Sequence, residues 1–92
     1  ARGFHARFVH SERMTLAFWR VIDGATLPTH AHPHEQVTTV RAGWFELTIG
    51  DETQLLGPGH VAVVPSGVPH SGRAVTACEL VDAFAPARDE YR

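Results

Sequence analysis

Three histidines stand close together in the first half of the chain, at His30, His32 and His34. On a β-strand, residues i and i+2 point to the same face, so His30 and His32 can converge on one metal ion, with nitrogen ligands at about 2 Å. Pro33 cannot donate a hydrogen bond to a neighbouring strand, so we expect a bend that takes His34 away from the ion. The spacing therefore predicts half of a metal site.

Two residues further along the chain are candidates for the remaining ligands. Gln36 lies four positions after His32 and can face inward from the next strand. His70 follows the rigid turn at residues 65–69, Pro-Ser-Gly-Val-Pro, which would fix the direction of its side chain. We predict one divalent metal ion held by four ligands: His30, His32, Gln36 and His70.

The ligand types carry information about the chemistry. Three imidazoles and one amide are neutral, so they leave the +2 charge of the ion uncompensated and make it a stronger Lewis acid. That favours polarising a carbonyl or enol oxygen over oxygen-dependent chemistry. A one-residue shift would bring in Glu35 instead of Gln36 and reverse the argument, and His34 is a further alternative. The ion could be Zn, Ni, Fe or Mn, and the residues do not select among them.

A second set of candidate residues lies near the carboxyl end of the sequence. Asp82 and Phe84 share a face if they lie on a strand, and Arg88 follows in the turn beyond. Beside a metal ion, Asp82 could transfer a proton, Phe84 could stack on a sugar ring, and Arg88 could hold a carboxylate through two hydrogen bonds. The alternative is a surface ion pair between Asp82 and Arg88, worth under about 1 kcal/mol, with Phe84 in the core.

The elements that must position these residues are short strands separated by glycine and proline. Strand starts roughly eight to twelve residues apart are typical of a β-sandwich or barrel, and no segment has the sustained periodicity of a helix. Strands are predicted at residues 4–10, 16–22, 36–41, 44–49, 54–56, 61–64 and 76–84, with 85–92 as a short tail or lid. The 92 residues form one all-β domain, residues 1–92.

Composition excludes several classes of function. The net charge of −2 gives no reason to expect nucleic acid or an anionic membrane as a partner. The apolar runs are too short for a transmembrane helix, and no signal peptide is visible. The single cysteine, Cys78, cannot form a disulfide within the chain and fits a reducing, cytoplasmic compartment. Because the sequence starts at Ala1 rather than Met, a leader or first strand could precede it.

Two tryptophans, Trp19 and Trp44, could line a cavity or lie at an interface. Alternation along the strand places Trp44 opposite Phe45, so one of the two must lie outside the barrel. An outward aromatic residue predicts a homodimer, which would also cover an open sheet edge.

Two stretches of the sequence resemble the paired motifs of the cupin family. The first, residues 24–43, reads Gly24-x5-His30-x-His32-x3-Gln36-x6-Gly43, with Gln where many cupins have Glu. The second, residues 59–74, reads Gly59-x5-Pro65-x-Gly67-x2-His70, and Ala74 stands where Asn is common. The resemblance implies an RmlC-like cupin barrel, or jelly roll (double-stranded β-helix), with two antiparallel sheets and the metal inside the wider end.

Residues 82–91, Asp-Ala-Phe-Ala-Pro-Ala-Arg-Asp-Glu-Tyr, resemble the end of the small cupins found with pectin and alginate breakdown. Residues 30–36, His-Ala-His-Pro-His-Glu-Gln, match the metal-site sequence of the same group. Those enzymes help 4,5-unsaturated uronates convert to their linear keto form, which implies that Asp82, Phe84 and Arg88 are catalytic or bind substrate. The predicted function is a metal-dependent, isomerase-like enzyme for a small anionic sugar. A dioxygenase or polyketide-type cyclase, and a non-catalytic cupin that binds a small molecule, are the alternatives.

Overall fold

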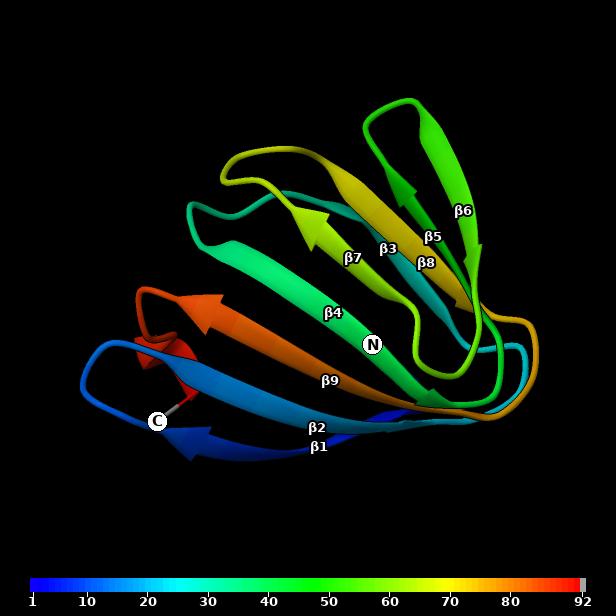
Figure 1. Ribbon diagram of the computed structural model, residues 1–92, viewed down its shortest axis with the longest axis horizontal. Helices are drawn as coiled ribbons and strands as arrows, with labels where there is room; N and C mark the ends of the chain where they lie inside the picture. Colours follow the sequence, from blue (N-terminus) through cyan, green and yellow to red (C-terminus); the bar gives the residue numbers. More distant parts are fainter. Residues whose placement is uncertain (92) are drawn as a thin grey trace.

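The computed structural model describes residues 1–91, which form β-strands and one short 3-10 helix (Figure 1). In chain order they are β1 (Phe4–His10), β2 (Thr15–Val21), β3 (Thr26–His30), β4 (Glu35–Ala42), β5 (Phe45–Ile49), β6 (Glu52–Leu56), β7 (Val61–Val64), β8 (His70–Ala74), β9 (Cys78–Ala85) and the 3-10 helix η1 (Asp89–Tyr91). The all-β prediction is confirmed.

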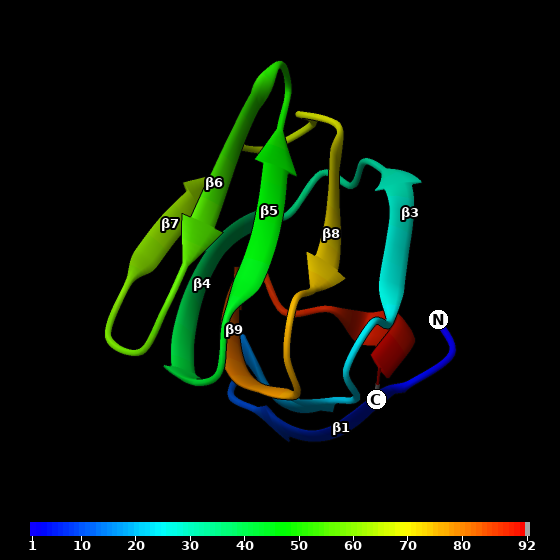
Figure 2. The same ribbon diagram turned by 90° about the vertical axis from the view of Figure 1, so that its right-hand side faces the viewer.

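The strands form two antiparallel sheets, one with the order β1-β2-β9-β4-β7 and one with the order β3-β8-β5-β6. In the first sheet β9 lies between β2 and β4, so strands distant in the sequence are paired, as in a jelly roll. The sheets diverge towards the left in Figure 1. Figure 2 places η1 and the amino terminus on the same side of the barrel. The predicted jelly roll is therefore confirmed.

Strand register decides which side chains face the barrel interior. Thr38 of β4 is the partner of Asp82 of β9, and Asp82 is also the partner of Ala17 of β2. All three are buried, so this row of the five-stranded sheet points inward. Because side chains alternate along a strand, Gln36 and Val40 of β4 point inward as well. One face of β4 thus carries both core and polar residues.

The sequence predictions missed β3 and β8, the two strands that hold His30 and His70. Their sequences, Thr-Leu-Pro-Thr-His and His-Ser-Gly-Arg-Ala, are poor in the β-branched and aromatic residues that favour strands. They form because they pair with each other, while β8 also pairs with β5. Pro28 is tolerated in β3 because β3 is an edge strand.

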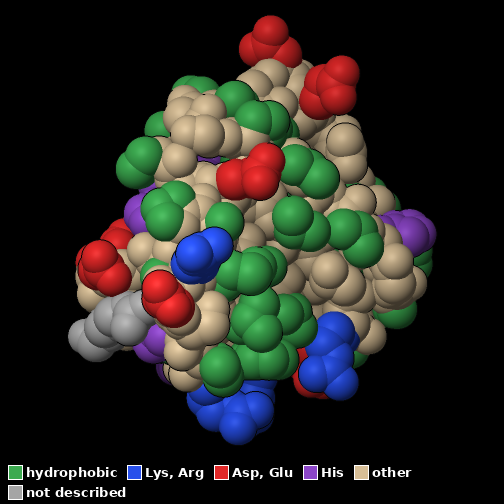
Figure 3. All heavy atoms as spheres, turned by 60° about the vertical axis from the view of Figure 1, so that its left-hand side comes forward, with side chains coloured by type: hydrophobic (Ala, Val, Ile, Leu, Met, Phe, Trp, Pro, Cys, Tyr) green, Lys and Arg blue, Asp and Glu red, His purple; other side chains and the backbone are tan. Residues whose placement is uncertain are grey.

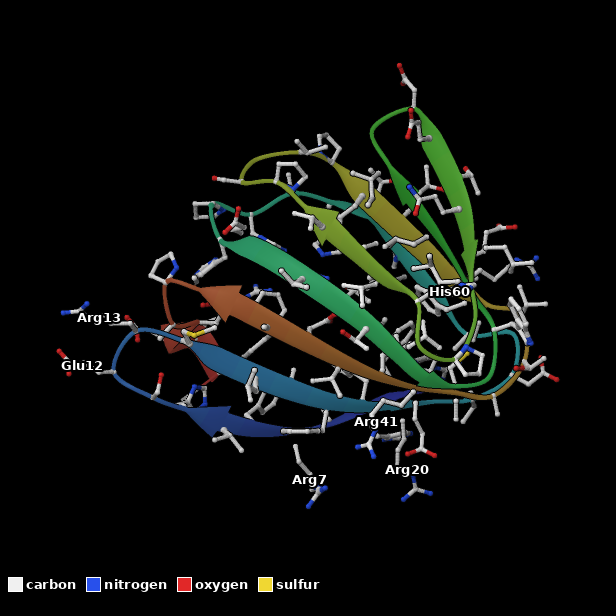
Figure 4. The ribbon with its side chains drawn as sticks, in the orientation of Figure 1. Arg7, Glu12, Arg13, Arg20, Arg41 and His60 are labelled. Carbon is white, nitrogen blue, oxygen red and sulfur yellow. The ribbon has the colours of Figure 1, made fainter. Side chains whose placement is uncertain are left out.

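Apolar residues form a row across the outer face of the five-stranded sheet. The register joins Val9, Leu16, Ala83, Val37 and Val63, one from each strand. Figure 3 shows a surface on which hydrophobic side chains gather. Arg side chains that Figure 4 labels, at positions 7, 20 and 41, project away from the same sheet.

The expected outward aromatic residue is Trp44, whose side chain is 43% exposed, whereas Phe45 is buried. The predicted homodimer stays a prediction.

Cys78 is buried in β9, and its thiol donates to the carbonyl oxygen of Trp44 at 3.0 Å. No helix among residues 1–91 is long and apolar enough to span a membrane.

Candidate metal centre and its cavity

Three histidines meet at the end of the barrel where β3 finishes and β8 begins. His30 is the last residue of β3 and is paired with His70, the first residue of β8. Their ring centroids are 4.2 Å apart, and the ring of His32 lies 4.8 Å from that of His70. One potential ligand atom from each histidine lies within 4.8 Å of the others. The three residues are therefore placed to hold a single metal ion.

His32 reaches this cluster from a loop and not from a strand, which corrects the expected reason for its convergence with His30. β3 ends at His30, and His32 lies in the connection to β4. A second loop holds that connection: Gly67 N–H donates to His32 O at 2.9 Å, and Ser66 Oγ donates to Pro33 O at 2.6 Å. Gly67 adopts a φ of +76°, a conformation that favours glycine.

Each of the three imidazole rings has its Nδ1 fixed by a main-chain carbonyl group. The acceptors are Pro28 O for His30 (3.0 Å), His34 O for His32 (2.9 Å) and Val68 O for His70 (2.9 Å). A carbonyl oxygen only accepts, so each Nδ1 carries a proton, and the lone pair of a neutral ring is then on Nε2. Histidines that bind metals are held in the same manner, with the second nitrogen bonded to a carbonyl or carboxylate group.

In a neutral ring with its proton on Nδ1, Nε2 can only accept a hydrogen bond. Two of the three Nε2 atoms have no donor to accept from in the described part of the chain. His70 Nε2 is buried and makes no hydrogen bond within residues 1–91. His32 Nε2 lies 3.0 Å from Gln36 Oε1, so one lone pair faces another. Burial lowers the pKa of both His32 and His70, which keeps their rings neutral. Two atoms that bind one ion at about 2.1 Å in neighbouring positions lie about 3 Å apart. These residues therefore fit a divalent metal ion.

The two alternatives to Gln36 lie elsewhere. Glu35 is exposed at the start of β4, where it alternates with the buried Gln36. His34 is buried, but its ring packs against those of His32 and Phe84, at 5.7 and 6.5 Å, outside the three-histidine cluster. Gln36 is thus the candidate that faces the histidines.

Asp82 is connected to the metal centre through two buried polar side chains. Thr38 Oγ1 donates to Asp82 Oδ1 at 2.6 Å, and Gln36 Nε2 donates to Thr38 Oγ1 at 2.9 Å. Burial raises the pKa of Asp82 to about 6, although the hydrogen bond from Thr38 opposes this rise. A carboxyl group with such a pKa can take up and release a proton near neutral pH.

A cavity of about 130 Å³ lies between the two sheets and contains this site. Its walls include His30, His70, Asp82, Phe84 and Arg88. A cavity of about 150 Å³ holds one benzene molecule, so the space is suited to a ligand of about one six-membered ring. The structure thus brings three of the four metal candidates, and the carboxyl-terminal candidates, to the same cavity, with His32 beside His70.

Arg88 enters the cavity wall from the segment after β9. Its guanidinium lies over the rings of Phe84 and Tyr91, at 4.9 and 4.4 Å from their centroids. It donates to Glu90 Oε2 from Nε and Nη2, and these bonds hold the pKa of Glu90 below its usual value. Asp82 is buried and Arg88 pairs with Glu90, so the alternative of a surface ion pair between Asp82 and Arg88 is wrong.

Trp19 is a cavity residue that the sequence left undecided between cavity and interface. Its side chain lines the cavity, and its Nε1 is buried without a hydrogen bond within the described residues. It lies close enough to Asp82 to contribute to lowering that carboxyl's pKa. The alternation of β2 would have indicated its inward position once the register with β9 was known.

The segment that carries Arg88 is fastened to the β1–β2 hairpin. Arg88 N–H donates to Thr15 Oγ1 at 2.8 Å, and this hydroxyl lies 2.9 Å from His10 Nδ1. His10 Nε2 donates to Tyr91 O at 3.1 Å, and the rings of Phe8 and Tyr91 stack at 4.4 Å. The predicted tail is thus a docked segment that ends in the 3-10 helix η1.

His60 is the histidine of the second motif that lies away from the site. It is exposed, and its Nδ1 accepts a hydrogen bond from Gly57 N at 2.8 Å. Figure 4 shows it at the right-hand end of the barrel, by the start of β7, whereas the cluster lies where β3 ends and β8 begins. His60 is therefore a useful control residue for experiments on the metal centre.

Comparison with known proteins identifies the family. Residues 17–84 match the family model of the cupin domain. This chain belongs to the cupin family. The recognition based on the two sequence motifs is therefore confirmed. Cupins commonly bind a metal ion, and the three clustered histidines could hold one here.

Individual proteins similar to this cupin come from several bacteria. An uncharacterised Streptomyces coelicolor protein is 29% identical over 68 residues, which cover 74% of this chain and 65% of that protein. The structure of KdgF from a Halomonas species is 26% identical, with a TM-score of 0.95, and the match covers 100% of this chain and 86% of KdgF. A salicylate 1,2-dioxygenase mutant from Pseudoaminobacter salicylatoxidans is 26% identical, with a TM-score of 0.87. The match covers 92% of this chain and 27% of the dioxygenase chain.

Proposed function

We propose that this cupin is a metal-dependent, isomerase-like enzyme that promotes ring opening and ketonization of 4,5-unsaturated uronates or a closely related anionic sugar. The observation that carries the proposal is the meeting of three kinds of group around one cavity of about 130 Å³: the histidine cluster, the Asp82 carboxyl and the Arg88 guanidinium. The reaction requires a proton carrier, a Lewis acid and an anchor for a carboxylate, and the cavity wall offers a candidate for each.

The reaction itself is an isomerization. In the ring form of the sugar, C5 carries the ring oxygen and the carboxylate, and it is joined to C4 by a double bond. Loss of the proton of the anomeric hydroxyl, as the bond between C1 and the ring oxygen breaks, gives an aldehyde at C1 and an enol at C5. The former ring oxygen takes up a proton to complete the enol, and a proton added at C4 with loss of that O–H proton then converts the enol to a ketone. No atom is gained or lost, so the enzyme only needs to move protons and stabilise charge.

Asp82 is the proposed proton carrier. Its raised pKa, about 6, leaves it ionised at neutral pH but able to accept a proton from a hydroxyl group in the cavity. Arg88 is the proposed anchor, because the guanidinium N–H groups that do not bind Glu90 can hold the substrate carboxylate. Phe84 is buried in the cavity wall against Arg88, and its proposed role is to stack on the sugar ring.

A divalent metal ion on His30, His32, Gln36 and His70 would supply Lewis-acid polarisation of a substrate oxygen. The cavity volume of about 130 Å³ is of the size of about one sugar ring, which agrees with a monomeric uronate. The resemblance of residues 82–91 to the uronate-ketonizing cupins and the similarity to KdgF over the whole chain both support this substrate class.

The test is to follow the loss of the alkene's ultraviolet absorbance when metal-loaded protein is mixed with freshly made 4,5-unsaturated galacturonate. The spontaneous rate is subtracted, and Asp82→Ala and His70→Ala are measured beside wild type. His60→Ala is the matched control, because His60 lies at the other end of the barrel. We expect acceleration by wild type and the control that both site substitutions abolish. No acceleration by protein that holds one metal ion per chain would refute this substrate.

A metal-dependent dioxygenase is the second candidate, and one specific observation favours it. The chain is 26% identical to a salicylate 1,2-dioxygenase mutant, with a TM-score of 0.87. The two proposals differ in oxygen use, since the isomerization consumes none. Oxygen uptake by iron-loaded protein with an aromatic acid as substrate, but not with the unsaturated uronate, would favour the dioxygenase.

A further inference from the structure

We propose that Thr38 is a positioning residue that fixes which end of the Gln36 amide faces the metal centre. This inference rests on the proposed metal centre, but it does not depend on the substrate. It assigns a role to a side chain that lines the cavity and contacts both the candidate ligand Gln36 and the candidate proton carrier Asp82.

The positions of these residues follow from the strands. Gln36 and Thr38 are two residues apart on β4, so their side chains leave the same face. Asp82 is the β9 partner of Thr38, and the two side chains meet across the strand pair. Thr38 is 2% exposed, so solvent does not compete for its hydroxyl group.

Hydrogen-bond polarity then determines the amide orientation. The Thr38 hydroxyl has one proton, and the bond of 2.6 Å gives it to the Asp82 carboxylate, which can only accept. The Thr38 oxygen can therefore only accept from Gln36. Only the Nε2 end of the amide can donate, so Nε2 faces Thr38, at 2.9 Å. The oxygen Oε1 must face the other way, towards His32 Nε2.

The orientation matters because the two ends of an amide have nearly the same size and opposite chemistry. The oxygen carries lone pairs and can bind a cation, whereas the NH2 group carries two protons and repels one. Sterics alone do not distinguish the ends, so the fixed direction comes from hydrogen-bond partners: Thr38, to which Nε2 donates at 2.9 Å, and the nearby Asp82 carboxylate, whose pKa is raised by burial and partly lowered by Gln36. Partners that orient a ligand commonly change metal affinity by about 10- to 100-fold when they are removed.

The experiment measures metal affinity and uses two pairs of proteins that differ by one hydroxyl group. Thr38→Val is compared with wild type, and Thr38→Ala is compared with Thr38→Ser. Thr39→Val is the matched control, because Thr39 lies on the same strand, on the opposite face, between Val61 and Val81. Affinity for Zn²⁺ and Ni²⁺ is obtained by competition with a chromophoric chelator. The visible spectrum of the Co²⁺ form reports the ligand set independently of any activity.

We expect Thr38→Val and Thr38→Ala to bind metal about 10- to 100-fold more weakly, with an altered Co²⁺ spectrum. Thr38→Ser and Thr39→Val should stay close to wild type. Unchanged affinity and spectrum in Thr38→Val would overturn the inference and leave the metal centre standing. Equal weakening in Thr38→Ser and Thr38→Ala would also overturn it, because packing and not the hydroxyl would then be responsible. Should Thr38→Val fail to fold, the Ser and Ala pair decides. Absence of metal binding by wild type would overturn both proposals.

Discussion

Glu90 accepts two hydrogen bonds from the guanidinium of Arg88, from Nε at 2.9 Å and from Nη2 at 2.6 Å. The rings of Phe84 and Tyr91 lie against the same group. One edge of the guanidinium is thus held by Glu90 and two aromatic rings pack beside it, while its remaining N–H groups are available to a ligand. Such a preorganised group loses little conformational entropy when it binds a carboxylate.

We expect Arg88→Lys to raise KM for the unsaturated uronate by about tenfold or more, with a smaller change in kcat. Lysine keeps the charge but cannot form two parallel hydrogen bonds, and hydrogen bonds to charged groups contribute about 1.5–3 kcal/mol. Steady-state kinetics in the ultraviolet assay checks this. Arg73→Lys is the control, because Arg73 forms an exposed pair with Glu46. An unchanged KM in Arg88→Lys would assign carboxylate binding to another residue.

Metal binding should stabilise the fold through the histidine cluster. A ligand at 100 times its Kd adds about 2.7 kcal/mol to the free energy of unfolding, which raises Tm by about 10 °C or more in a domain of this size. We expect this shift on adding Zn²⁺ or Ni²⁺ to metal-free wild type, and its loss in His70→Ala. Thermal unfolding with and without the ion measures it. His60→Ala should keep the shift, and an equal loss in that variant would argue against the proposed centre.

The buried carboxyl group of Asp82 should make the metal-free protein less stable as pH rises. Its pKa in the folded protein, about 6, lies about two pH units above the unfolded value, so the folded state binds the proton more tightly. The contribution of Asp82 to the free energy of unfolding is therefore fully present below about pH 4 and falls between about pH 4 and 6. Above that range the free energy of unfolding is lower by about 3 kcal/mol. Asp82→Asn should remove this decline.

Urea unfolding of metal-free wild type and Asp82→Asn from pH 4 to 8 tests the prediction. The difference between the two proteins isolates the effect of Asp82 from that of the histidines. The lowered pKa values of His32 and His70 make the free energy of unfolding increase as pH rises, which is opposite to the effect of Asp82. Asp51→Asn, in the exposed turn between β5 and β6, serves as the control. Parallel pH profiles for wild type and Asp82→Asn would contradict a raised pKa.

Trp19 offers a buried N–H group to a ligand oxygen. Because its Nε1 lies near the Asp82 carboxyl but makes no close hydrogen bond within the described residues, we expect it to bind a substrate hydroxyl or carboxylate oxygen. Trp19→Phe should raise KM by about 2- to 10-fold, as expected for a neutral hydrogen bond, and should leave metal affinity unchanged. Trp44→Phe, at an exposed position, is the control. A loss of metal affinity in Trp19→Phe would point to a structural effect instead.

The spacing of histidines and glycines was sufficient to predict the fold family and to name candidate ligands that lie close together. The two motifs predicted His30, His32, Gln36 and His70, and the structure places these four side chains together. The exclusion of His34 also followed from Pro33. Local sequence could not reveal β3 and β8, because these strands depend on pairing with distant segments and not on their own propensity.

Features that depend on register could not be predicted. Thr38 and Trp19 are ordinary inward residues of β4 and β2 until the pairing with β9 places both beside Asp82. His32 required a loop–loop contact with Gly67, which no strand pattern describes. In each case the information lies in which strands or loops are neighbours, and that is a property of the whole fold.

The contact between the β1–β2 hairpin and the carboxyl-terminal segment has a consequence for protein engineering. Thr15 and His10 hold the backbone on either side of Glu90, so the direction of Arg88 is set by residues that are far from it in the sequence. Both bonds use backbone groups of the carboxyl-terminal segment, Arg88 N–H and Tyr91 O, so a chimera that receives only that segment still offers them to Thr15 and His10. A chimera whose new hairpin lacks this threonine and histidine loses both bonds. Exchange of the carboxyl-terminal segment between cupins of this shape should therefore succeed when the receiving hairpin keeps a threonine and a histidine at these two positions.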